Sequence, residues 1–378
     1  MKILIAPDSF KHSLTAREIC NSLRKGLLQS PGVKDIRLLP MGDGGEGTIE
    51  AIFDVAGGQK ITIEVHDPLM RKIRAEYLVF ENGSTAFIEM ANASGIELLR
   101  EEERDPWLTT TYGTGEFIKD ALDRGIRKFI IGVGGSATND GGMGMARALG
   151  ARFLNEYGQE VNQGGGNLGK IKEIRLDGFD PRVKHCEMRV ACDVENILTG
   201  MNGASIAYSK QKGANDLMAE KLDKRMWKFY QLCSDPTHKH IPDTPGAGAA
   251  GGLAAGLAVF CQAGLYKGFD LIAEYLGLEE KITEADIVIT GEGKVDQQTL
   301  QGKVPAGIAK LARKHGRISI CIAGMLGKDW EKLYDHGMDL ILPIQENPSN
   351  LDKALEKTPE LLEKTGFRIG KIIELIAR

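Results

Sequence analysis

Three glycine-rich turns carry carboxylates directly after short apolar runs. They are DGGEG at 43–47, GGSATNDGG at 134–142 and GEGKVD at 291–296. Glycine lets a backbone approach an anion closely and adopt positive φ, while a nearby Asp or Glu can hold the divalent cation that shields phosphate charge. The three turns together therefore indicate a site that binds phosphate and a metal ion.

Other glycine patterns must be weighed against this interpretation. GVGGSA at 132–137 fits GxGxxA, and PGAGAAGG at 245–252 contains GxGxxG, both forms of the dinucleotide fingerprint. The first lacks an acidic strand end at the expected distance, and the second follows a Pro-rich loop instead of a strand. An NAD-dependent oxidoreductase is therefore the weaker alternative. A GxxxxGK run at 164–170 has Ile171 where a P-loop needs Ser or Thr, so we interpret it as a surface loop.

Short apolar runs near both chain ends alternate with helical patterns. A helix is predicted from Thr15, where Glu18 completes a capping box. Five strands of this kind favour an open parallel sheet. The predicted strands are 3–6, 36–39, 286–290, 318–323 and 340–344.

The chain changes character at 59–65, where Ile61, Ile63 and Val65 alternate with polar residues. A hairpin through the ENGS turn at 81–84 follows, so a mixed sheet begins there. These patterns predict an α/β fold with a doubly wound parallel-sheet domain made from both chain ends, residues 1–59 and 284–378. Residues 60–283 form an inserted mixed α/β domain, and a cleft is expected between the two.

Ligands of open α/β sheets gather beyond the carboxyl ends of the strands. PDSFK at 7–11 follows the first predicted strand, and DGGEG follows the second. GGSATND follows the apolar run 128–133, and GEGKVD follows 286–290. The chemistry-bearing turns thus occupy the positions where a site is expected.

Composition favours small-molecule chemistry. The 378 residues include 48 Lys+Arg against 52 Asp+Glu, with the signs interspersed, which argues against a nucleic-acid surface or a polybasic membrane patch. The uncharged segment 244–266 is rich in Gly and Ala, so we expect a buried helix there and no membrane span. The six cysteines are scattered without a CxxC pair, as expected of reduced thiols in a cytoplasmic protein.

The chain resembles the glycerate kinases of the bacterial type over nearly its whole length, through eight motifs in the same order. These are APDSFK, MGDGGEG, TTYGTGE, GVGGSATNDGG, VACDV, QKGA, PGAGAAGGL and ITGEGKVDQQT. The resemblance implies ATP-dependent phosphorylation of D-glycerate to 2-phosphoglycerate and a flavodoxin-like domain formed by both termini. A kinase that forms 3-phosphoglycerate or acts on another small hydroxy acid stays open, since regiochemistry depends on placing one hydroxyl in line.

Phosphoryl transfer requires Mg²⁺ held by carboxylates, a cation near the transferred group and a group that positions or deprotonates the acceptor hydroxyl. Asp43 is the first candidate for metal ligand or base. Asp193 could take the proton of the acceptor while Asp296 serves the metal, and the sequence does not separate these two. All three aspartates are therefore candidate catalytic residues and metal ligands. Lys212 is the candidate catalytic cation, although an isolated lysine is more often a solvated surface charge.

The remaining candidates bind the ATP phosphates or the substrate. The turn before the helix 143–149 can offer hydroxyls and backbone amides to phosphate or to the substrate carboxylate. The candidates for ATP are Gly134, Gly135, Ser136, Thr138, Asn139, Glu292 and Lys294. Asp8, Ser9 and Lys11 follow the first strand and are candidates for the substrate, with Lys11 placed to pair with a carboxylate of the substrate or of the protein.

Overall fold

The computed structural model describes residues 1–33, 35–233, 240–346 and 350–376, which form two compact units. Unit 1 consists of Met1–Asp43, Glu50–Gly57 and Lys267–Arg378. Unit 2 consists of Gly44–Ile49 and Gly58–Tyr266. Both chain ends therefore belong to one unit, and the middle of the chain forms the other.

The second boundary between the two units lies between Tyr266 and Lys267, which is earlier in the chain than the predicted boundary at residue 283. Helices α9 (Gly268–Tyr275) and α10 (Leu278–Glu284) belong to unit 1. A Cβ atom on Gly307 of α11 (Val304–Lys314) would lie 2.1 Å from the ring of Phe269 of α9, so α9 packs closely against α11. The amphipathic patterns of α9 and α10 do not reveal which sheet they cover, which explains the error.

Unit 1 is built on a five-stranded sheet whose strands are all parallel, in the order β13-β12-β11-β1-β2. This order is that of the flavodoxin-like doubly wound fold, and the predicted fold class is confirmed. The strands are β1 (Lys2–Ile5), β2 (Asp35–Leu38), β11 (Ile287–Val295), β12 (Ile318–Leu326) and β13 (Leu340–Pro343).

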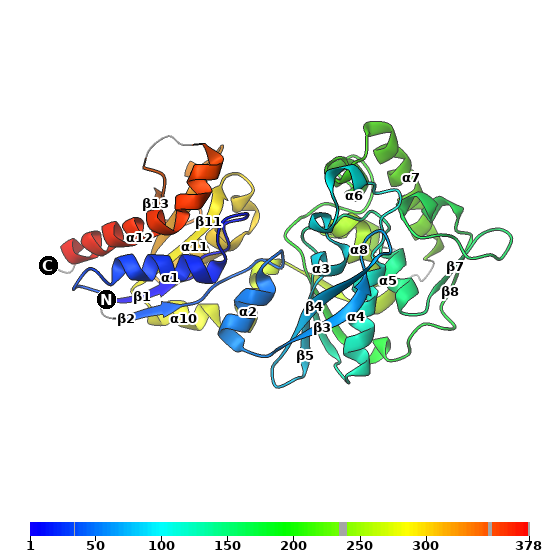
Figure 1. Ribbon diagram of the computed structural model, residues 1–378, viewed down its shortest axis with the longest axis horizontal. Coiled ribbons are helices and arrows are strands. Elements are labelled where there is room, and N and C mark those ends of the chain that lie inside the picture. Colours follow the sequence, from blue (N-terminus) through cyan, green and yellow to red (C-terminus); the bar gives the residue numbers. More distant parts are fainter. Residues whose placement is uncertain (34, 234–239, 347–349, 377–378) are drawn as a thin grey trace. The chain divides into compact units, whose positions relative to one another are not determined.

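Helices cover both faces of this sheet. Alternate residues of the strands pack against α1 (Ala16–Leu27) and α12 (Leu351–Ile376), which lie side by side in Figure 1. The intervening residues pack against α11 (Val304–Lys314). Thr15 and Glu18 form the predicted capping box at the start of α1. Helix α2 (Thr48–Ala56) follows the DGGEG turn.

Unit 2 contains a six-stranded mixed sheet in the order β10-β9-β6-β5-β4-β3. Strands β3, β4 and β5 pair antiparallel, with Phe80 opposite Thr85 across the predicted hairpin turn, and the other neighbours pair parallel. The strands are β3 (Gln59–His66), β4 (Lys72–Phe80), β5 (Thr85–Glu89), β6 (Lys128–Gly132), β9 (Glu187–Ala191) and β10 (Gly264–Tyr266). Strands β7 (Arg152–Leu154) and β8 (Glu173–Arg175) form a separate pair.

Short and long helices surround the sheet of unit 2. The α-helices are α3 (Ala91–Ser94), α4 (Tyr112–Asp123), α5 (Met143–Ala148), α6 (Ala204–Tyr208), α7 (Asp216–Leu232) and α8 (Ala249–Cys261). The 3-10 helices among the described residues of both units are η1 (Ile96–Leu98), η2 (Glu101–Glu103), η3 (Gly165–Lys170), η4 (Val183–His185), η5 (Lys210–Lys212), η7 (Ile241–Asp243), η8 (Thr299–Gln301) and η9 (Trp330–Leu333).

The uncharged segment contains the buried helix α8, as predicted. Within the described residues, no helix combines the length and the apolar character needed to cross a membrane. The prediction of a surface loop at 164–170 was wrong. Gly165, Gly166 and Leu168 of η3 are buried, and a Cβ atom on Gly166 would lie 2.1 Å from the indole nitrogen of Trp107. The glycines of this run permit close packing.

Candidate active site

The predicted site residues form two groups, one in each unit. Unit 1 holds Asp43 together with the PDSFK and GEGKVD turns, and unit 2 holds Asp193, Lys212 and the GGSATND turn. In unit 1, the parallel pairing of β1 with β11 brings two of these turns together. The backbone N–H of Asp8 donates to the carbonyl of Gly291 at 2.9 Å, so the turn after β1 lies beside Glu292.

Glu292 is the most deeply buried carboxylate of this group. Its side chain is 6% exposed, accepts a hydrogen bond from the hydroxyl of Thr299 and lies 3.7 Å from Nζ of Lys303. Burial raises the pKa of Glu292 to about 7, and the charges of Asp43 and Asp296 act in the same direction. Glu292 therefore shares its surroundings with at least two other carboxylates.

Asp8 belongs to the same group. Burial among neighbouring atoms raises the pKa of Asp8 well above its usual value, and the negative charges of Asp43 and Glu292 add to this effect. We call Asp8, Asp43, Glu292, Asp296 and Lys303 the unit 1 cluster. Its four carboxyl groups outnumber the two ammonium groups beside them, which are those of Lys303 and of Lys294, the partner of Asp296.

Asp296 is held as a carboxylate directly after β11, because the segment predicted as the GEGKVD turn continues this strand to Val295. Its oxygens accept from the backbone N–H of Gln298 at 2.9 Å and from Nζ of Lys294 at 2.9 Å. Burial opposes ionisation, but these partners and the charge of Lys303 outweigh it and lower the pKa of Asp296. Lys294 is 52% exposed on its side chain and therefore remains accessible to a ligand.

Lys303 was missed in the sequence analysis. It is the N-cap residue of α11, where no side chain caps the helix and no acidic residue lies in the first turn. Burial acts to lower the pKa of Lys303, but the surrounding carboxylates outweigh burial and raise it. A cation is unfavourable at the positive end of a helix dipole, and this anomaly is the signal that could have identified the residue.

The other candidate residues of the PDSFK turn are Ser9 and Lys11. Ser9 is half-buried and donates its backbone N–H to Oδ1 of Asp8 at 2.7 Å. Lys11 is exposed, and within the described part of the chain no ion pair joins it to a carboxylate. The predicted pairing of Lys11 with a protein carboxylate is therefore not observed.

Glycines of the DGGEG turn pack against the sheet of unit 2. A Cβ atom on Gly44 would lie 2.6 Å from Cβ of Ala191 at the end of β9, and one on Gly132 at the end of β6 would lie 2.1 Å from the carbonyl of Gly44. Gly44 also has a φ of 87°, which a side chain would strain. The turn therefore requires glycine for close backbone contact at the carboxyl ends of β6 and β9.

The GGSATND turn presents only its first part to the surroundings. Gly135 is exposed with a φ of 70°, Gly134 is half-buried, and Ser136 is 9% exposed. Thr138 and Asn139 are fully buried, with Oγ1 of Thr138 donating to the carbonyl of Ala250 at 3.4 Å and Nδ2 of Asn139 to Ser205 at 2.9 Å. These two side chains hold the turn in place, which differs from their predicted contact with ATP.

Asp140 organises the turn, a role that the sequence analysis did not assign. Its buried carboxylate accepts from the backbone N–H groups of Thr111, Gly142 and Gly144 at 2.8 to 3.1 Å. The hydroxyls of Thr110 and Thr111 donate to it as well. Asp140 thereby joins the TTYGTGE motif to the start of α5. Burial raises its pKa, although these hydrogen bonds act in the opposite direction.

Lys212 reaches the same turn from η5. Its Nζ donates to the hydroxyl of Ser136 at 2.7 Å and to the carbonyl of Thr138 at 2.7 Å. The residue is 2% exposed, and burial lowers the pKa of Lys212 to about 7. Lys212 is thus not a solvated surface charge, and the structure places it beside the predicted Ser136.

Asp193 lies two residues beyond β9, half-buried, at the edge of the sheet from which the GGSATND turn also emerges. The predicted metal ligands are therefore divided, with Asp43 and Asp296 in unit 1 and Asp193 in unit 2. Across the described residues, no three carboxylate, imidazole or thiol groups are arranged to hold a metal ion by themselves.

The PGAGAAGG pattern has a structural explanation. Gly251 has a φ of 62°, and a Cβ atom there would lie 2.0 Å from the carbonyl of Thr138. The carbonyl of Gly251 accepts from the N–H of Gly141 at 3.0 Å. These glycines support the GGSATND turn, so the pattern gives no support to dinucleotide binding.

Comparison with known proteins assigns the chain to a family. The model of the glycerate kinase family matches residues 3–374. The chain belongs to this family. It is 44% identical to glycerate 2-kinase of Escherichia coli K12, with 94% of this chain and 93% of the relative covered, and 42% identical to glycerate kinase of Halalkalibacterium halodurans, with 98% and 97% covered. The crystal structure of a candidate glycerate kinase 2 from Salmonella typhimurium LT2 superposes with a TM-score of 0.88 at 41% identity, covering 99% of this chain and 98% of that one.

Family membership settles the class of reaction. As a member of the glycerate kinase family, the chain is a phosphotransferase with an alcohol group as acceptor. The oxidoreductase alternative is thereby excluded. The eight motifs that suggested the resemblance include the turns described above in both units.

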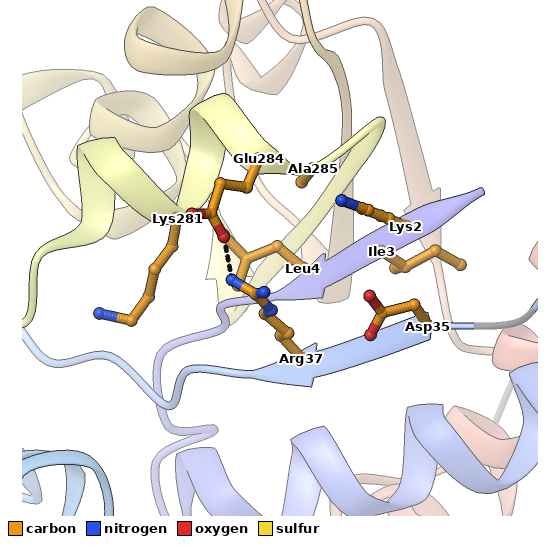
Figure 2. Close-up of a pocket in the computed structure, with 8 residues that line it drawn as sticks. All are labelled: Lys2, Ile3, Leu4, Asp35, Arg37, Lys281, Glu284 and Ala285. Carbon is orange, nitrogen blue, oxygen red and sulfur yellow. Dashed lines mark hydrogen bonds and ion pairs between the residues drawn. The ribbon is translucent and has the colours of Figure 1, made fainter.

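A small cavity lies elsewhere in unit 1 (Figure 2). Lys2, Leu4, Arg37 and Glu284 are among the residues that line it, at the amino ends of β1 and β2, and Arg37 forms an ion pair with Glu284. Ligands of such sheets bind at the opposite, carboxyl edge. None of the predicted site residues lines this cavity, so we do not assign it to the active site.

Proposed function

We propose that this chain is an ATP- and Mg²⁺-dependent kinase that phosphorylates D-glycerate at the 2-hydroxyl to give 2-phospho-D-glycerate. The match of residues 3–374 to the glycerate kinase family is the observation that carries the proposal. The 2-hydroxyl is favoured because a relative with 44% identity is named glycerate 2-kinase.

The unit 1 cluster fits Mg²⁺ that arrives with ATP. Mg²⁺ is usually bound through one or two carboxylates together with substrate phosphates, so three protein ligands are not needed. Burial is the main cause of the raised pKa values of Asp8 and Glu292, and the negative charges of the neighbouring carboxylates add to it, which supports the binding of a further cation. Asp43 and Asp296 would hold the ion, which when bound would offset the charge of the phosphates.

Protein side chains around the cluster would bind and orient the phosphates. Lys303 and Lys294 offer ammonium groups, and Lys303 lies within the cluster. Glu292 fixes the position of Lys303 and of the η8 turn through its ion pair and its bond to Thr299. Positioning and electrostatic stabilisation are the main contributions that phosphoryl transfer requires of a protein.

Unit 2 would hold the acceptor and remove its proton. Gly134 and Gly135 form the accessible part of the GGSATND turn, and Ser136 is buried next to them with Lys212 as its partner. Asp193 is half-buried at the same sheet edge and is the candidate base for the acceptor hydroxyl. A carboxylate in this role positions the hydroxyl and accepts its proton.

An enolase-coupled assay tests this function. Purified protein is mixed with D-glycerate, MgATP and enolase, and the formation of phosphoenolpyruvate is followed with and without phosphoglycerate mutase. We expect a signal without mutase that disappears when ATP or D-glycerate is omitted and falls when EDTA removes Mg²⁺. A signal that requires mutase would indicate the 3-phosphate, and no consumption of ATP with D-glycerate would contradict the proposed substrate.

A further inference from the structure

Lys212 is buried without an anion in contact with it. Its hydrogen-bond partners, the hydroxyl of Ser136 and the carbonyl of Thr138, are both neutral, and within the described residues no carboxylate forms an ion pair with it. A buried ammonium group that lacks a contacting anion is costly. The surroundings of Lys212 are therefore incomplete in the free protein and suited to an anionic ligand.

Charged groups on the surrounding elements do not fill this role. Asp140 acts on Lys212 through its charge, but its oxygens already accept hydrogen bonds from Thr111, Gly142 and Gly144. Lys210 of η5 pairs with Asp216 of α7 at 2.5 Å. Next to Lys212 in the chain, Gly213 packs against the backbone of Arg104. A Cβ atom on Gly213 would lie only 1.9 Å from the carbonyl oxygen of Arg104.

We propose that the Ser136–Lys212 pair binds the carboxylate of the hydroxy-acid acceptor, and that this carboxylate and one proton bind together. The proposal rests on the proposed function, which names glycerate as the acceptor. One ammonium and one hydroxyl match the two oxygens and single charge of a carboxylate. ATP phosphates carry several charges and need more cations than this pair offers.

The carboxylate binds together with a proton because Lys212 is buried. Because burial lowers the pKa of Lys212 to about 7, its amine is mostly neutral at pH 8 in the free protein. An adjacent carboxylate favours the charged form and raises this pKa. Binding at pH 8 therefore converts the amine to an ammonium group by taking a proton from solvent, with no other bond changed. At pH 6 the group is already charged, and little uptake remains.

Calorimetric titration of D-glycerate into the whole protein measures this uptake. Titrations at one pH in buffers of different ionisation enthalpy give the number of protons bound, both without nucleotide and with Mg²⁺ and a non-hydrolysable ATP analogue. We expect about one proton taken up per glycerate at pH 8 and a value near zero at pH 6. The dissociation constant should rise about tenfold per pH unit above pH 7.

Two variants identify the group that takes up the proton. Lys212→Arg keeps a permanent charge, so proton uptake and the pH dependence of affinity should disappear. Lys210→Met removes a neighbouring exposed lysine and should leave both unchanged. If Lys212→Arg does not fold, proton uptake by the native protein still tests the proposal. Absence of proton uptake at pH 8 overturns it.

Other outcomes would also overturn the proposal. These are uptake that persists in Lys212→Arg, uptake that accompanies MgATP in place of glycerate, and failure of glycerate to bind in both conditions. The proposed function fails separately, when the enolase-coupled assay shows no turnover of D-glycerate. Turnover without proton uptake would reject the subsite and leave the proposed function intact.

Discussion

Lys303 places one ammonium group among the carboxylates of the unit 1 cluster. The position is unusual, because a lysine at the N-cap of α11 meets the positive end of the helix dipole. The nearby carboxylates offset this cost, since they raise the pKa of Lys303 despite its burial. We infer that its charge serves ligand binding more than helix stability.

Replacing Lys303 tests this inference. We expect Lys303→Met to lower kcat/KM for MgATP by roughly a hundredfold, because a preorganised cation at the phosphates is lost. Lys314→Met is the matched control, since Lys314 lies in the last turn of the same helix and pairs with Glu279 at the surface. Equal, small effects of the two substitutions in steady-state kinetics would show that Lys303 has no role in the reaction.

Lys212 should make protein stability depend on pH. Its pKa falls from 10.5 in the unfolded chain to about 7 in the folded protein, so between these values the unfolded chain binds the extra proton. The buried charge of Lys212 therefore lowers the free energy of unfolding by its full amount below about pH 7. This destabilisation becomes smaller as pH rises towards 10.5. Lys212→Met removes it and should raise the free energy of unfolding by more at pH 6 than at pH 9.

Urea unfolding at the two pH values measures this difference. The hydrogen bonds lost to Ser136 and Thr138 lower stability at both pH values, so the comparison between them isolates the titration. Lys210→Met should show no such difference. If Lys212→Met raises the free energy of unfolding equally at pH 6 and pH 9, Lys212 remains charged in the folded protein.

At the scale of elements, helices α1 and α12 approach each other at glycines. A Cβ atom on Gly26 would lie 1.9 Å from the carbonyl oxygen of Glu363, and one on Gly366 would lie 2.4 Å from the carbonyl oxygen of Leu23. Both obstacles are backbone atoms that cannot rotate away. The glycines therefore determine how closely the two helices pack over the sheet of unit 1.

Gly26→Ala should lower the free energy of unfolding by about 2 kcal/mol, because overpacking outweighs the better helix propensity of alanine. Gly32→Ala is the control near the same helix, since its Cβ atom would lie 3.4 Å from the side chain of Glu374. Chemical denaturation followed by circular dichroism compares the two. Unchanged stability of Gly26→Ala would show that α1 and α12 can separate without cost.

The secondary structure of both sheets was largely predictable because its signals are local. Alternating apolar residues marked β3, and the Thr15–Glu18 box marked the start of α1. Lys303 and Asp140 were missed because part of their surroundings is assembled only by the fold, as with Lys303 and Asp8 or Asp140 and Thr111. The pattern of residue types also does not show which polar side chains of a turn face inward.

At the scale of the whole molecule, the candidate site residues are divided between two units. Asp43 and Asp296 belong to unit 1, whereas Ser136, Asp193 and Lys212 belong to unit 2. Each group follows the carboxyl ends of parallel strands in its own sheet. The proposed function therefore assigns a role in phosphoryl transfer to residues of each unit.

Turnover of D-glycerate by Asp43→Asn and Asp193→Asn tests this claim most directly. We predict that each substitution lowers kcat by at least about a hundredfold, because each removes a charge needed in the transition state. Glu46→Gln, at an exposed carboxylate of the same DGGEG turn, should retain most activity. Circular dichroism and thermal unfolding should show that all three variants fold. Near-native kcat in either aspartate variant would contradict the account.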